Sequence, residues 1–151
     1  MTGMLKEIEG AANTLGTKLQ FVPATGGGDL EPAFAAMVNG RAEAIIIFPS
    51  PMLYGQYARI VDLAASSRLP AIYAAREGAE LGGLVSYGVN LADLSRATAV
   101  YLEKILKGAK PAELPVQQPT KLELVINLKA AKTLGLVVTR EFLLVADEVI
   151  E

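Results

Sequence analysis

The chain has 151 residues, of which 52% are hydrophobic and 20% are charged, a composition typical of one globular domain with a buried core. Fourteen Lys and Arg against sixteen Asp and Glu give a net charge of −2, so the positive field needed to bind a nucleic-acid backbone is absent. The sequence contains no Cys, His or Trp. Disulfides, thiol catalysis, structural zinc and histidine bases are therefore excluded, and we expect no cofactor.

The first third of the chain alternates helical and extended patterns. Apolar residues recur at helical spacing from Leu5 to Leu15, and a continuous apolar run typical of a strand covered on both faces begins at Ala44. These patterns predict a helix over 4–15 ended by Gly16, a strand over 18–23, a helix over 30–38 capped by Asp29, and a central strand over 44–48.

The rest of the chain continues the alternation. Ser50 and Pro51 are typical of a helix start, Asn90 and Asp93 resemble a capping box, and three prolines between 109 and 120 indicate an extended connector. The predicted elements are helices over 51–64, 76–81, 91–107, 128–135 and 139–149, and strands over 69–74, 83–87 and 121–126. Strands separated by helices predict an α/β fold with parallel strands in three α/β/α layers.

Candidate binding residues follow from this topology, because ligands of open α/β sheets bind beyond the carboxyl ends of the strands. The loops predicted there supply tyrosines that can stack and donate hydrogen bonds, and a carboxylate that can hold an ammonium. We expect ligand contacts from Ser50, Tyr54, Tyr73, Glu77, Tyr87 and Asn90. Structural alternatives stay open, since Ser50 and Asn90 are also explained as helix caps and the tyrosines as core residues.

Two other features of the sequence do not indicate a functional site. The glycines at 26–28 lack both the Lys-Ser/Thr pair of a phosphate loop and the complete Gly-x-Gly-x-x-Gly spacing. The carboxylates of Asp147, Glu148 and Glu151 are interpreted as a solvated face, not a catalytic pair. No nucleophile stands beside a base, so we expect a protein that is not an enzyme and has neither catalytic residues nor a metal.

Several stretches go beyond a generic α/β pattern. They are Leu69–Tyr73, Gly82–Gly88, the Lys-Ile-Leu-Lys-Gly-Ala-Lys-Pro-Ala-Glu-Leu-Pro-Val segment over 104–116, Glu123–Lys132 and the closing Ala146–Glu151. Together they resemble the C-terminal half of an ABC-transporter substrate-binding protein, in the type I periplasmic-binding class that includes tryptophan-binding proteins.

The resemblance implies two α/β lobes that close on a small organic solute, such as an amino acid or aromatic carboxylate, and an ABC permease as partner. It also implies a periplasmic or extracytoplasmic location, although the N-terminus lacks the pattern of a signal peptide. Mapped onto it, residues 1–82 form most of the second lobe, 83–110 a strand and helix of the first lobe, and 111–151 the connector, return strand and C-terminal helices.

The same mapping leaves out the first lobe and the first strand of the second lobe, so unpaired neighbouring strands are expected. A homodimer, with possible exchange of the 83–108 element, would cover them. Two other functions stay open: a small α/β enzyme that uses Glu77 or a lysine as acid or base, and a self-association domain without a ligand.

Overall fold

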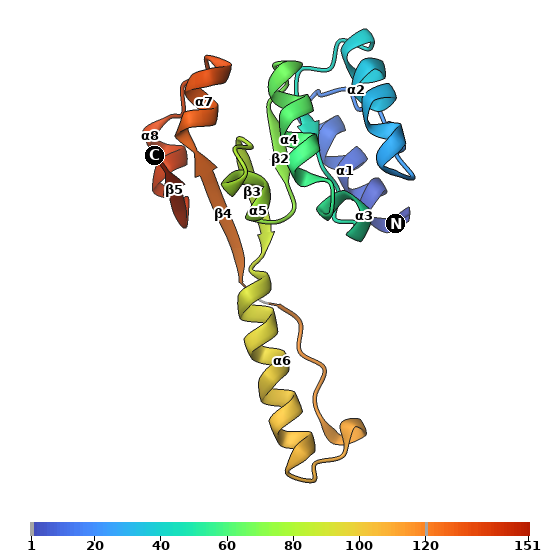
Figure 1. The fold of residues 1–151 in the computed structure, drawn as a ribbon, viewed down its shortest axis with the longest axis vertical. Helices are drawn as coiled ribbons and strands as arrows, with labels where there is room; N and C mark the ends of the chain where they lie inside the picture. Colours follow the sequence, from blue (N-terminus) through green and yellow to red (C-terminus); the bar gives the residue numbers. More distant parts are fainter. Residues whose placement is uncertain (1, 120) are drawn as a thin grey trace. The chain divides into compact units, whose positions relative to one another are not determined.

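A computed structural model describes residues 2–119 and 121–151 of the chain (Figure 1). The chain divides into two compact units, one formed by residues up to Ala42 and the other by residues 43–151. No helix in these described ranges is long and apolar enough to cross a membrane.

The first unit contains two helices and a short 3-10 turn, which are α1 (Thr2–Thr14), η1 (Gly27–Asp29) and α2 (Leu30–Asn39). The predicted first helix is confirmed, and it ends where Gly16 adopts a left-handed φ of 66° that few other residues tolerate. The predicted strand over 18–23 is wrong. That segment pairs with no strand among the described residues, and extended backbone becomes a strand only when a neighbour satisfies its hydrogen bonds.

Asp29 organises the turn before α2 in a way that differs from the prediction. It occupies the N-cap position of α2, but its side chain makes no capping bond to that helix. The carboxylate instead accepts hydrogen bonds from the Thr25 amide and hydroxyl, both at 2.7 Å, and from the Gly26 amide at 3.0 Å. These bonds, led by that from the Thr25 hydroxyl, hold the pKa of Asp29 below its ordinary value.

The second unit is built on a five-stranded sheet in the order β1-β2-β3-β4-β5. Its strands are β1 (Ile45–Ile46), β2 (Ala71–Tyr73), β3 (Val85–Val89), β4 (Leu122–Asn127) and β5 (Glu148–Ile150). All neighbouring pairs are parallel except β3 and β4. The predicted α/β class with a mostly parallel sheet is thus confirmed.

Two predictions within this sheet are wrong. The apolar run over 44–48 does not form a central strand: β1 is the first in the strand order, and the side chain of Ile46 is 51% exposed. The predicted helix over 139–149 is replaced by α8 (Arg140–Leu144) and by β5, because β4 offers Val125, Ile126 and Asn127 as partners for Glu148–Ile150. Pairing with an existing strand outweighs local helical spacing there.

Short helices connect the strands of the second unit, namely α3 (Pro51–Tyr54), α4 (Tyr57–Ser66), α5 (Glu77–Glu80) and α7 (Leu128–Leu134). The single helix predicted after Ser50 is therefore divided, since α3 ends at its C-cap, Gly55. The N-cap of α7 is confirmed. Asn127 Oδ1 accepts from the Ala130 amide at 3.0 Å, while its Nδ2 donates to the Ala79 carbonyl at 3.0 Å, so one buried side chain joins α7 to α5.

Glycines allow the backbone around β2 and β3 to approach closely. A Cβ on Gly78 or Gly83 would lie 2.3 Å from atoms of the Tyr73 ring, so both glycines are needed to seat that ring. A Cβ on Gly88 would lie 1.9 Å from the Ala74 carbonyl oxygen, in a contact between backbone atoms that cannot be moved aside cheaply. The end of β3 is therefore packed tightly against the loop that follows β2.

A long helix, α6 (Leu91–Leu106), follows β3 and is joined to β4 by a connector that contains the short 3-10 turn η2 (Pro111–Glu113). As predicted, Asn90 caps α6 by accepting from the Asp93 amide at 3.0 Å, and the chain turns at Gly108 with a φ of 99°. Figure 1 shows α6 and the connector side by side, and the Tyr101 hydroxyl donates to the Pro115 carbonyl at 2.5 Å. We call residues 91–119 the α6 arm.

None of the residues of α6 is buried. Helical spacing places Leu94, Ala97, Tyr101 and Ile105 on one face, and all four are at least partly exposed. That face and the connector line a groove of about 560 Å³ that reaches Val89 and Asn90 at its base. The division at residues 82/83 and 110/111 stays a prediction. In the segment 83–110, β3 pairs with β2 and β4 in the sheet, whereas no residue of α6 is buried.

Candidate ligand-binding site

The carboxyl ends of β1, β2 and β3 lie at one edge of the sheet, because these three strands are parallel. Ser50 and Tyr54 follow β1, Glu77 follows β2, and Asn90 follows β3. The topology therefore places four of the predicted site residues at the edge where ligands of α/β sheets bind. Tyr73 and Tyr87 lie within strands instead.

An aromatic chain runs inward from this edge. The rings of Tyr54 and Tyr57 meet edge to face with centroids 5.3 Å apart, and Tyr57 meets Tyr73 in the same way, also at 5.3 Å. Tyr54 is half-buried, whereas Tyr73 is 1% exposed. The Tyr73 ring thus has a packing role, and its hydroxyl and that of Ser86 have no hydrogen-bond partner among the described residues.

Glu77 acts electrostatically on Tyr54, the outermost of the three tyrosines that meet edge to face. Burial raises the pKa of Tyr54, and the negative charge of Glu77 raises it further. Glu77 itself is exposed as the first residue of α5. A half-buried aromatic ring beside an exposed carboxylate is an arrangement that can receive an aromatic amine.

The other predicted residues do not all converge. Ser50 is half-buried at the N-cap of α3, but its side chain makes no capping bond, so the capping explanation for this serine is wrong. Tyr87 is exposed, and it lies on the sheet face opposite Tyr73, because Tyr73 pairs in register with Ser86 and neighbouring strand residues alternate between faces. One pocket cannot therefore contain both tyrosines.

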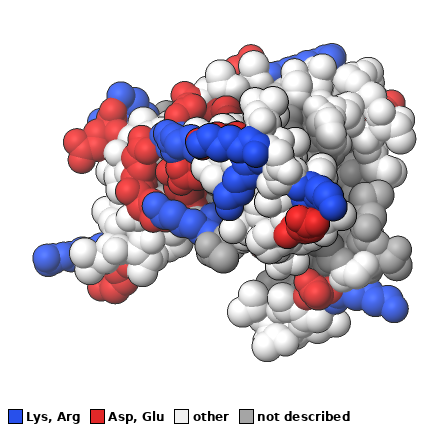
Figure 2. Space-filling view, turned by 90° about the horizontal axis from the view of Figure 1, so that it is seen from below, with Lys and Arg blue, Asp and Glu red and all other residues white. Residues whose placement is uncertain are grey.

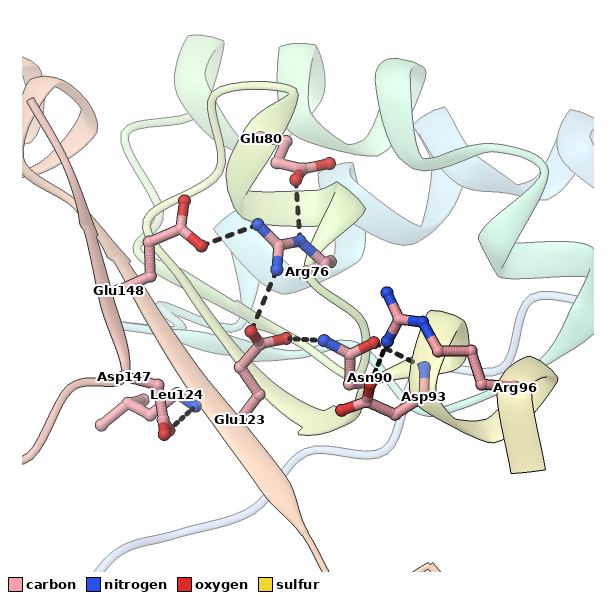
Figure 3. A network of polar contacts seen from close by, with 9 residues as sticks. All are labelled: Arg76, Glu80, Asn90, Asp93, Arg96, Glu123, Leu124, Asp147 and Glu148. Atoms are coloured by element: carbon pink, nitrogen blue, oxygen red, sulfur yellow. Dashed lines mark hydrogen bonds and ion pairs between the residues drawn. The ribbon is translucent and has the colours of Figure 1, made fainter.

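A polar network centred on Arg76 occupies the same edge (Figure 3). Arg76 Nε binds Glu80 Oε1 at 2.8 Å, Nη1 binds Glu123 Oε1 at 3.0 Å, and Nη2 binds Glu148 Oε2 at 2.7 Å. The second oxygen of Glu123 accepts from Asn90 Nδ2 at 3.0 Å. The network thus connects the loop after β2, the end of β3 and the strands β4 and β5.

The charges in this network do not balance, since one guanidinium faces three carboxylates and leaves a net charge of −2. The bonds to Glu80 and Glu148 raise the pKa of Arg76. With each arm of its guanidinium paired, Arg76 is poorly placed to bind a ligand carboxylate. The described residues contain no His, Cys, Asp or Glu group suited to a metal ion.

Sequence reasoning missed Glu123 and Glu148. Glu148 and Asp147 were assigned to a solvated face, but Glu148 binds Arg76, and Asp147 Oδ2 accepts from the Leu124 amide at 2.9 Å. The one available signal was Glu123, a charged residue flanked by Leu122 and Leu124 in a predicted strand. Figure 2 shows positive and negative side chains next to one another on the face seen from below.

The fold and the site define a protein of the α/β binding-protein class, and comparison with known proteins identifies its family. The chain matches the family described as "ABC transporter substrate binding protein" over residues 3–150 and belongs to it. None of the curated proteins compared with it matches.

Two solved structures are similar over nearly the whole chain. A conserved domain protein from Vibrio cholerae has a TM-score of 0.87 and 25% identity, covering 98% of this chain and 50% of that one. The ABC domain in complex with L-Trp from Streptococcus pneumonia has a TM-score of 0.87 and 27% identity, covering 99% and 51%.

A third structure shares the fold at lower identity. It is the ligand-free, open structure of a substrate binding protein with adhesive properties from Clostridium difficile, with a TM-score of 0.66 and 18% identity. The chain covers 99% of its own length in this match and 50% of the other chain. It therefore spans about half the length of the solved chains it resembles.

Proposed function

We propose that the chain forms part of a clamp that binds a small organic solute for import by an ABC transporter, outside the cytoplasm. The solute class is an aromatic amino acid or a related aromatic compound. Family membership and the similarity to a protein solved with L-Trp support this role. On this proposal the chain binds its solute without transforming it, and an ABC permease receives the solute.

The observation that carries the solute class is that Tyr54 and Glu77 follow the parallel strands β1 and β2 and so come to the same edge of the sheet. Tyr54 presents a half-buried ring at the carboxyl edge of the sheet, and the Glu77 charge acts on its hydroxyl. An aromatic solute can stack on this ring while its ammonium approaches the carboxylate. The net negative charge around Arg76 favours the same orientation.

The remaining predicted contacts are assigned by their position in the sheet and by their burial. Ser50 follows β1 and is proposed to bind a polar group of the solute. Asn90 follows β3, and because its side chain is bonded to Glu123 and to the Asp93 amide, it is proposed to support the site from behind. Tyr87 is exposed on the other sheet face, so the proposed pocket at Tyr54 does not include it. Tyr73, which is buried, is proposed to act by supporting the aromatic chain.

Isothermal titration with three ligands tests the proposal: L-tryptophan, tryptamine, which lacks the carboxylate, and indole-3-acetate, which lacks the ammonium. We expect L-tryptophan and tryptamine to bind and indole-3-acetate to bind at least tenfold more weakly. Glu77→Gln should remove this preference, whereas Glu9→Gln, on the exposed side of α1, should not. Equal binding of all three ligands, or of none, would contradict the proposal.

A further inference from the structure

The α6 arm is attached to the sheet at two chain crossings, and one hydrogen-bonded pair lies between them. Asn90 is the residue at which β3 passes into α6, and Glu123 is the second residue of β4, just after the connector returns. Asn90 Nδ2 donates to Glu123 Oε2 at 3.0 Å, so this contact closes the base of the arm.

Asn90 uses both ends of its side chain. While Nδ2 binds Glu123, Oδ1 accepts from the Asp93 amide in the first turn of α6. The position of this one side chain is thus coupled directly to the start of the helix. Glu123 is therefore linked to the first turn of α6 through two hydrogen bonds.

Glu123 is in turn held by Arg76. Its other oxygen, Oε1, lies 3.0 Å from Arg76 Nη1, and its side chain is only 13% exposed. Arg76 follows the Ala74 loop, against which the backbone of Gly88 is packed, and Gly88 is the register partner of Glu123. The guanidinium therefore reaches Glu123 across the end of β3, at a position where Gly88 contributes no side chain.

Two further ion pairs fix Arg76 itself. Glu80 holds Nε at 2.8 Å and Glu148 holds Nη2 at 2.7 Å, so the guanidinium is anchored on α5 and on β5 while its third arm faces Glu123. A planar group bound on three sides has little freedom to rotate. Figure 3 shows Arg76, in the loop after β2, held between Glu80, Glu123 and Glu148.

We propose that Arg76, acting through Glu123 and Asn90, is a positioning residue that sets the angle at which the α6 arm leaves the sheet. The inference about the angle stands on this geometry alone. Its consequence, that the same contacts set how far a solute clamp opens, rests on the proposed function.

The lever is long enough to make small changes measurable. Sixteen helical residues extend about 24 Å at 1.5 Å each, so a tilt of about 10° at Asn90 displaces the far end of α6 by about 4 Å. The chain has no native cysteine, so spin labels on Asp62→Cys in α4 and Lys107→Cys beyond α6 would be the only labels present. Pulsed electron–electron double resonance then gives the distribution of distances between the label on α4 and the label on the α6 arm.

Arg76→Gln and Glu123→Gln should broaden this distribution or shift its mean by several ångströms. Arg96→Gln is the matched control for Arg76→Gln. Arg96 binds Asp93 within α6, so this substitution removes the same charge without changing a contact to the sheet. Arg76→Lys, which keeps the charge but not the three-armed geometry, should give an intermediate width. Circular dichroism verifies that each variant is folded.

Distributions that are unchanged in Arg76→Gln and Glu123→Gln, or changed equally by Arg96→Gln, would overturn the positioning role. Adding L-tryptophan separates this inference from the proposed function. Arg76→Gln and Glu123→Gln can shift the distance distribution without ligand while L-tryptophan moves none of the distributions. That result would support the positioning role and contradict the solute clamp.

Discussion

Arg76 and Glu123 are joined by an ion pair with an Nη1–Oε1 distance of 3.0 Å although 47 positions separate them in the chain. The pair connects the loop after β2 to β4 across β3. Because the Glu123 side chain is 13% exposed, it interacts in surroundings that screen charge less than bulk water does.

Removing Arg76 should therefore destabilise the second unit. Arg76→Ala leaves three carboxylates without their cation, and we expect the free energy of unfolding to fall by about 1 to 3 kcal/mol. Arg96→Ala, which breaks a pair with exposed partners, should cost at most about 0.5 kcal/mol. Urea denaturation at pH 7 measures both, and equal losses would contradict the difference in environment.

Asn127→Ala should destabilise the fold more than a simple cap deletion does. The substitution removes both the cap of α7 and a buried donor to the Ala79 carbonyl, for an expected loss of about 2 to 4 kcal/mol. Thr139→Ala, which removes only the 3.3 Å cap of α8, should cost about 0.5 to 1 kcal/mol. Similar losses in thermal or urea unfolding would show that the Ala79 bond contributes little.

Two glycine-to-alanine substitutions should have opposite effects. Gly88→Ala places a Cβ 1.9 Å from the Ala74 carbonyl oxygen and should cost about 3 kcal/mol or more. Gly10→Ala, in the middle of α1 with nothing within 4 Å of the new Cβ, should stabilise that helix by about 0.5 to 1 kcal/mol. Circular dichroism melting curves compare the two variants, and a tolerated Gly88→Ala would refute the close approach of β3 to the loop.

Asp29 should contribute stability that depends on pH. Its pKa lies below the ordinary value of 3.8, so the folded state binds the proton less readily than the unfolded chain. The stabilisation is complete above about pH 4 and is lost as the pH falls through the lowered pKa. Asp29→Asn should lower stability at neutral pH and flatten its decline below about pH 4, as measured by urea unfolding from pH 2 to 7. Parallel acid limbs for both proteins would contradict this.

The exposed apolar residues of the α6 arm lead to a prediction about self-association. Leu106 is 78% exposed and Val116 is 96% exposed, and we propose that a second copy covers them in a homodimer. Leu106→Glu should weaken association by at least tenfold in sedimentation velocity, whereas Lys110→Glu, nearby but without apolar surface, should have a smaller effect. A monomeric wild-type chain at micromolar concentration would rule this dimer out.

Local signals in the sequence were sufficient for the caps of α6 and α7 and for the glycines at three helix ends, although not for Asp29 and Ser50, whose side chains make no capping bond. Asn90 and Asn127 cap the helices that follow them, and Gly16, Gly108 and Gly135 adopt the left-handed conformation at the predicted helix ends. Capping involves residues three or four positions apart, so the sequence contains all of the interacting groups. The family resemblance was recoverable for a similar reason, because it depends on contiguous segments.

The predicted strands over 69–74, 83–87 and 121–126 are confirmed as β2, β3 and β4, but the other strand assignments and the polar site were not determined locally. The segments 18–23 and 139–149 were misassigned because a strand depends on a partner elsewhere in the chain, and β5 forms only where β4 offers one. Likewise, nothing near Arg76 in the sequence identifies Glu123 or Glu148 as its partners. The sequence by itself determined the fold class, the family and the caps of α6 and α7. Only the tertiary structure decided which strands pair and which carboxylates meet Arg76, because those interactions join residues that come together when the sheet is assembled.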